Sequence, residues 1–125
     1  MGLVLEIKAG EEIIVNGALL KSKVKTRLEF LNTARFLVGK QIMKIKDAST
    51  PARRVYFLLQ NAYVGPSESL LEAREEARAL ISSLSSQASS DNRISLDTLL
   101  HLISEEVTYD AIKVARRLIQ TEKPI

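Results

Sequence analysis

The hydrophobic period of this chain changes once, near Thr50-Pro51, and this change restricts the fold more than any other feature. Before it, apolar residues tend to alternate along short segments, as in half-buried strands. Beyond it, apolar residues recur at helical spacing, at Val55, Leu58, Leu59 and Ala62. Thr50 can cap free amides, and Pro51 suits the first helical position. Strands followed by helices predict an α+β fold with segregated layers.

A small N-terminal antiparallel β-sheet of four or five strands, one face of it covered, is expected in residues 1-47. Leu3, Leu5 and Ile7 alternate with their neighbours at period two. Asn16-Gly17 separates two apolar runs and tolerates the positive φ of a type I′ turn, which predicts a hairpin. Further strands are expected from Lys23 to Phe30 and from Arg35 to Val38.

Three or four α-helices are expected in residues 48-125. The first runs from Pro51 to about Tyr63, and the second runs from Ser67 or Ser69 to Leu84. Residues 82-93 are rich in serine and are interpreted as a flexible surface loop. The third helix is predicted to begin near Ser95, and a last helix carries Ile112, Ala115, Leu118 and Ile119.

The length of 125 residues predicts a single domain, 1-125, with a basic β-rich part at 1-47 and a helical part at 48-125. The charge is divided unevenly within it. Through Gln60 there are 11 cations against 5 acids, a net charge of +6. From Asn61 onward there are 7 cations against 10 acids, a net charge of −3. A basic half and an acidic half favour a polyanionic partner for the first.

Catalysis has little support in the sequence. There is no cysteine, and the one histidine, His101, falls on the polar side of its helix. Phosphate-binding, zinc-protease and serine-hydrolase motifs are absent, so we predict no enzyme, no metal and no cofactor. We find no secretory signal and no apolar run long enough to span a bilayer. A cytoplasmic protein without a membrane partner is therefore expected.

A row of cations is the first candidate binding surface. Lys21, Lys23, Lys25 and Arg27 are spaced by two, so they would share one face of an extended chain, about 6.5–7 Å apart. That spacing matches successive phosphates of a nucleic acid. The opposite face would pack inward, with Val24, Thr26, Leu28 and Phe30. The alternative is that lysines on an outer strand only prevent edge-to-edge aggregation.

Arg53 and Arg54 form the second candidate, at the start of the first helix. The helix dipole disfavours cations there by about 0.3–1 kcal/mol each when they are exposed. Free amides together with two guanidiniums could receive an anion such as phosphate. The alternative is that both arginines are solvated at the rim of a packed helix. Together with the lysine row, these residues are the candidates for binding a polyanion such as a nucleic-acid backbone, which would be RNA if the family resemblance given below holds.

A second surface is predicted on the last helix. Arg116 and Arg117, with Tyr109 and Ile112 a turn or two earlier, make an amphipathic face that could meet a partner protein. The same face could instead close the core of the domain. Open sheet edges also make a homodimer possible.

Three groups of residues resemble one known family. Leu3-x-Leu5-x-Ile7 with Gly10-Glu11 and Val15-Asn16-Gly17-Ala18 resembles the opening of the FlbT family of flagellin-synthesis regulators. Thr50-Pro51-Ala52-Arg53 with Tyr56-Phe57 is similar to its central signature. Tyr109-x-Ala111, Arg116-x-Leu118-Ile119 and Glu122 resemble its last helix. Many members carry a methionine-rich run after Tyr56-Phe57, and here that segment reads Leu58-Leu59-Gln60-Asn61-Ala62-Tyr63.

The resemblance implies a small cytoplasmic regulator that associates with the 5′ untranslated leader of flagellin mRNA and alters its stability or translation. It also implies a second flagellar regulator, FlaF, or flagellin itself as protein partners. The family includes repressors and apparent activators, so the resemblance does not say whether this chain represses or activates flagellin synthesis. The alternative is a protein-interaction module, an adaptor or chaperone directed at flagellin or FlaF, that affects the mRNA only indirectly.

Overall fold

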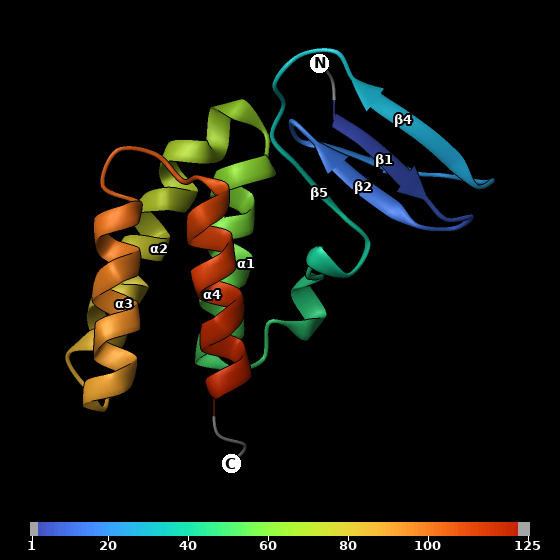
Figure 1. Ribbon diagram of the computed structural model, residues 1–125. Helices are drawn as coiled ribbons and strands as arrows, with labels where there is room; N and C mark the ends of the chain where they lie inside the picture. Colours follow the sequence, from blue (N-terminus) through green and yellow to red (C-terminus); the bar gives the residue numbers. More distant parts are fainter. Residues whose placement is uncertain (1–2, 123–125) are drawn as a thin grey trace.

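Five strands followed by four helices make up the computed structural model, which describes residues 3–122 (Figure 1). This order confirms the predicted α+β class. The strands are β1 (Leu3–Ile7), β2 (Glu12–Val15), β3 (Ala18–Lys21), β4 (Thr26–Phe30) and β5 (Phe36–Val38). Single 3-10 turns are η1 (Gly39–Gln41), η2 (Ile45–Asp47) and η3 (Ser67–Ser69). The helices are α1 (Pro51–Val64), α2 (Leu70–Ser85), α3 (Ser90–Leu102) and α4 (Tyr109–Thr121).

The strands form two antiparallel sheets, where a single sheet with one covered face was expected. One sheet pairs β1 with β4, and the other has the order β3-β2-β5. Ile14 and its cross-strand neighbour Leu37 pack with the helices. Ile13 points to the opposite face and is also buried, as is Ile7 of β1. The antiparallel strands were therefore predicted correctly, but the expectation of one covered face was wrong, because consecutive apolar residues of β2 are covered on both faces.

The β2–β3 hairpin was predicted correctly. Asn16 and Gly17 both have positive φ, 49° and 87°, as a type I′ turn requires. The amide of Gly17 donates to the carbonyl of Val64 at the end of α1, with an N···O distance of 2.7 Å. The turn therefore also joins the strands to the helices.

We expect Gly17→Ala to lower the free energy of unfolding by more than Gly10→Ala does. Both glycines have positive φ, which costs an L-residue about 1–2 kcal/mol. A Cβ at Gly17 would lie 3.0 Å from backbone atoms of Pro66, whereas a Cβ at Gly10 would meet nothing within 4 Å. Urea unfolding of the two variants measures the difference, and equal losses would contradict a close contact at the turn.

The four helices enclose the main core. α1 packs on α2 and α4, and α3 packs on the same two helices (Figure 1). Leu59, Ile81 and Leu99 are fully buried there, and Leu37 of β5 joins them. No helix among residues 3–122 is both long enough and apolar enough to cross a membrane.

The serine-rich segment is mostly helical, so the prediction of a flexible loop at 82-93 was wrong. α2 continues to Ser85 and α3 begins at Ser90, which also corrects the predicted start near Ser95. The buried Ser85 donates its hydroxyl to Asp97 at 2.7 Å, and Arg93 Nε donates to the Ser85 carbonyl at 3.1 Å. These contacts from α3 hold the serines in a helix despite their weak intrinsic propensity.

Candidate nucleic-acid interface

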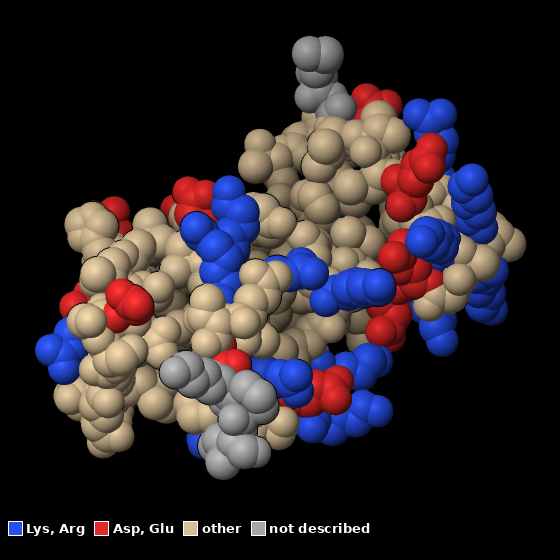
Figure 2. Space-filling view, turned by 60° about the horizontal axis from the view of Figure 1, so that its bottom comes forward, with Lys and Arg blue, Asp and Glu red and all other residues tan. Residues whose placement is uncertain are grey.

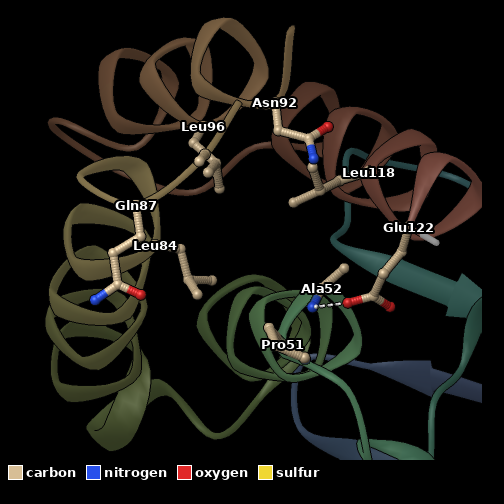
Figure 3. Close-up of a pocket in the computed structure, with 9 residues that line it drawn as sticks. Pro51, Ala52, Leu84, Gln87, Asn92, Leu96, Leu118 and Glu122 are labelled. Atoms are coloured by element: carbon tan, nitrogen blue, oxygen red, sulfur yellow. Dashed lines mark hydrogen bonds between the residues drawn. The ribbon is translucent and has the colours of Figure 1, made fainter. Parts of the chain in front are cut away.

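The start of α1 is capped by groups of the chain itself. The Thr50 hydroxyl accepts from the amide of Arg53 at 3.2 Å, as predicted, and the Thr50 carbonyl accepts from the amide of Arg54 at 2.9 Å. The amide of Ala52 donates to the carboxylate of Glu122 at 3.0 Å (Figure 3). Since Pro51 has no N–H, no free amide remains for an external anion. The expectation that free amides complete an anion site was therefore wrong.

The two arginines that follow the cap point to different places. Both side chains are exposed, but only Arg53 lines a cleft beside α1. That cleft, which we call the basic cleft, has a volume of about 460 Å³. It lies between α1, α4 and the segment that joins β5 to α1. Its lining residues are Lys40, Ile42, Met43, Asp47, Arg53, Tyr56, Arg116, Ile119 and Gln120.

Three cations from three separate segments meet at the basic cleft. Lys40 comes from η1, Arg53 from the first turn of α1 and Arg116 from the last turns of α4. Within residues 3–122, none of the three lies in an ion pair. Asp47 is the one acidic residue in the lining. The cleft therefore has three cations against one acid and a net positive lining, which suits an anionic ligand.

Tyr56 forms part of the wall of the basic cleft, which Arg116 also lines. Its hydroxyl donates to the carbonyl of Gln41. Burial raises the pKa of the Tyr56 hydroxyl, the guanidinium of Arg116 opposes that rise, and Tyr109 adds to it.

Gln60 holds the segment that carries Lys40 against α1. The buried amide side chain accepts from the Met43 N–H at 2.8 Å and donates to the Met43 carbonyl at 3.0 Å. Gln41 adds a second link by donating to the hydroxyl of Tyr109 at 2.8 Å. The segment has no strand or long helix of its own, so these side-chain bonds decide where its cations lie.

The predicted lysine row is not one extended strand. Lys21 ends β3, Lys23 lies in the reversal between the strands, Lys25 precedes β4 and Arg27 lies within it. The chain turns here because the Val24 carbonyl accepts from the hydroxyls of Ser22 and Thr26. All four cations are exposed. Val24 and Leu28 were expected to pack inward, but they are 66% and 41% exposed.

None of the four residues of the lysine row lines the basic cleft. Lys44, which follows Met43 of the cleft lining, has its amine 3.1 Å from Glu12, and Glu12 is the cross-strand neighbour of Lys21. In Figure 2, blue side chains gather over the strand end of the molecule, interspersed with acids, and again over its middle.

The four residues predicted to form a partner surface on α4 do not lie on one surface of the structure. Ile112 is only 2% exposed and belongs to the core, so its assignment to a partner surface was wrong. Tyr109 is 40% exposed and bonds to Gln41. Arg116 lines the basic cleft, and Arg117 is exposed outside it. Neighbouring helical residues point in different directions, which separates the two arginines.

Sequence reasoning missed Lys40 and Gln60. A signal for Lys40 existed, because Lys40, Lys44 and Lys46 follow one another closely between the last strand and the first helix. No such signal existed for Gln60, because a glutamine within an apolar helix does not indicate which group it will hydrogen-bond. No group of acidic or histidine side chains within residues 3–122 is arranged to hold a metal ion.

The structure so far defines a small α+β protein with a cationic cleft between its helices. The family model described as flagellar protein FlbT matches residues 3–125. A probable flagellum biosynthesis repressor protein FlbT of Chelativorans sp. is 36% identical over 97% of this chain and 83% of its own length. Corresponding proteins of Rhizobium leguminosarum and Bradyrhizobium diazoefficiens are each 31% identical over 97% of this chain, and over 81% and 89% of their own lengths.

The chain therefore belongs to the FlbT family of flagellar proteins. The resemblance seen in the three sequence motifs is confirmed over nearly the whole chain. No solved structure matches it significantly. A regulatory role in flagellum biogenesis follows from the names of these relatives, which describe repressors.

Proposed function

We propose that this protein represses flagellum biosynthesis after transcription, by associating in the cytoplasm with the 5′ untranslated leader of flagellin mRNA and altering its stability or translation. The observation that carries the proposal is the basic cleft, where Lys40, Arg53 and Arg116 meet and none of the three lies in an ion pair within the described chain. The names of the relatives favour repression over activation.

The cleft and the lysine row would act on different phosphates of one RNA. Guanidiniums in a cleft bind a phosphate through paired N–H groups, whereas exposed lysines act as point charges along the backbone. Lys21, Lys23, Lys25 and Arg27 would therefore add affinity without choosing a sequence. Arg54 stays a candidate for a peripheral contact next to Arg53.

A protein-interaction module directed at FlaF or flagellin is the second candidate function. It is favoured by the exposed apolar residues of the strands and their connections, among them Leu19, Leu20 and Leu31, which is 87% exposed. In this case the effect on the mRNA would be indirect. The remaining partner-surface candidates, Tyr109, Arg116 and Arg117, would serve the same interaction.

Fluorescence anisotropy with a labelled flagellin leader and an unrelated leader of equal length separates the two functions. We expect tighter binding to the flagellin leader at physiological salt. For about five phosphate contacts on single-stranded RNA, raising salt fourfold should weaken binding about 100-fold. Equal binding to both leaders, combined with tight binding of FlaF or flagellin, would favour the second function.

Reversal of the lysine row to glutamate, at Lys21, Lys23, Lys25 and Arg27, is expected to abolish leader binding. The fold should persist because all four side chains are exposed. The salt slope should fall by about 0.7 for each lost phosphate contact. Undiminished binding by a folded variant, checked by circular dichroism, would show that the row does not contact RNA.

A further inference from the structure

The lining of the basic cleft is more varied than the binding of a phosphate alone requires. Besides its three cations it contains apolar and aromatic residues, which are Ile42, Met43, Tyr56 and Ile119. Its volume of about 460 Å³ falls within the range of about 300–1,000 Å³ that is typical of pockets for small organic ligands. The cleft therefore has room and apolar surface for an organic group that is attached to the phosphate.

Asp47 is the residue of this lining that a phosphate site does not explain. It is exposed, and within residues 3–122 its carboxylate lies in no ion pair and accepts no hydrogen bond. A negative charge in the same lining as Lys40, Arg53 and Arg116 lowers the attraction of the cleft for any phosphate. An unpaired carboxylate in this place therefore indicates a hydrogen-bond donor on the ligand.

The position of Asp47 is fixed by hydrogen bonds on its own segment. Its amide donates to the carbonyl of Lys44 at 2.9 Å, which closes the turn η2. Just before this turn, Met43 is attached to α1 by its two hydrogen bonds to Gln60. Asp47 thus stands on a turn that is anchored to the same helix as Arg53, and such anchoring keeps the groups of a binding site in place.

We propose that the basic cleft is a site for a guanine nucleotide, in which the cations bind the phosphate and Asp47 binds the base. Guanine presents two adjacent donors, N1–H and the 2-amino group, which match the two oxygens of a carboxylate. Adenine and cytosine place an acceptor beside their donor, and uracil has one N–H between two carbonyls. A carboxylate therefore makes two hydrogen bonds to guanine and no more than one to the other three bases.

The remaining lining suits the rest of this base. The faces of a purine pack on apolar and aromatic side chains, which the cleft supplies. The acceptor O6 of guanine lies beside N1–H and needs a donor. The Tyr56 hydroxyl already donates to the Gln41 carbonyl, so the amide of Gln120 is the neutral group of the lining that is left for O6. The cleft thus offers partners for the phosphate, the edge and the faces of a guanine nucleotide.

This inference rests on the proposed function, in which the nucleotide is an unpaired guanosine of the leader RNA. Contacts of the lysine row with phosphates carry no sequence information, so the cleft would be the place where the protein distinguishes one leader from another. A free guanine nucleotide has the same chemistry. Comparison of GMP with RNA separates the two sources.

Asp47→Asn is the principal test, with Asp91→Asn as its matched control. Asp91 is also exposed and lies in no ion pair within residues 3–122, but it does not line the basic cleft. The probes are GMP, AMP and IMP, which lacks the 2-amino group, titrated at equal ionic strength and followed through the amide NMR signals of the cleft. Wild-type protein should bind GMP at least about 10-fold more tightly than AMP and about fivefold more tightly than IMP.

The sign of the change separates recognition of the base from an effect of net charge. Asp47→Asn should weaken GMP binding about 10-fold and remove the preference over IMP, because the amide replaces one acceptor by a donor. If Asp47 only reduced the positive field, the same substitution would strengthen the binding of all three nucleotides. Asp91→Asn should leave the preference unchanged. Stronger GMP binding by Asp47→Asn, or equal binding of GMP and AMP by wild-type protein, would overturn the proposal.

RNA probes test the source of the nucleotide. Wild-type protein should bind a hexamer of adenosines with one central guanosine about 10-fold more tightly than the all-adenosine hexamer, and Asp47→Asn should lose this preference. Asp47→Asn that is folded by circular dichroism and binds the flagellin leader like wild type would overturn the inference and leave the proposed function intact. Selective binding of GMP, combined with equal binding of flagellin and unrelated leaders, would support a site for a free guanine nucleotide and contradict the proposed function.

Discussion

The double variant Arg53→Glu with Arg116→Glu is expected to lose leader RNA affinity by about 100-fold at low salt. Hydrogen bonds to charged groups contribute about 1.5–3 kcal/mol each, and the variant removes the two guanidiniums that line the basic cleft. Two phosphate contacts fewer should also reduce the salt slope by about 1.4. A salt titration of leader binding measures both quantities.

Arg54→Glu with Arg117→Glu is the matched control for this experiment. It changes the same residue types on the same two helices by the same charge, but neither side chain lines the basic cleft. The control should lose only long-range attraction and the peripheral contact proposed for Arg54, a few-fold effect. Equal losses in the two double variants would show that net charge, and not the cleft, binds RNA. The cleft variant, Arg53→Glu with Arg116→Glu, should stay folded, because Arg53→Glu places an acid near a helix N-terminus, where acids are favoured.

Gln60→Ala is expected to give the largest loss of stability, about 2–4 kcal/mol in the free energy of unfolding. The substitution removes two hydrogen bonds and leaves the N–H and C=O of Met43 without their partner. It also leaves a cavity in place of the Gln60 side chain, because Gln60 is only 3% exposed. Urea unfolding measures the loss.

Asn61→Ala is the control for Gln60→Ala. Asn61 is the next residue of α1, is half-buried, and its side chain makes no hydrogen bond within the described part of the chain. Its substitution should cost well under 1 kcal/mol. Gln60→Ala should also speed amide exchange at Met43, because the segment carrying Lys40 loses its attachment to α1. A loss below about 0.5 kcal/mol for Gln60→Ala would contradict this role.

Local signals in the sequence were reliable where a few neighbouring residues decide the structure. Asn16-Gly17 specifies a turn with positive φ at both positions, and Thr50-Pro51 specifies a capped helix start, and both were found. Prediction failed in the serine-rich segment, because burial of Ser85 against α3 outweighs the local preference for a loop. It failed again at Lys23, where side-chain hydrogen bonds turn the chain.

The sequence by itself determined the α+β order, the hairpin, the helix start and the family, since each depends on residues close together in the chain or on motifs in a fixed order. Only the tertiary structure decided that the carboxylate of Glu122 accepts the hydrogen bond of the Ala52 amide. It also decided that Lys40, Arg53 and Arg116 line one cleft. These residues are separated by many positions, and only the packing of α4 and the Met43 segment on α1 brings them together.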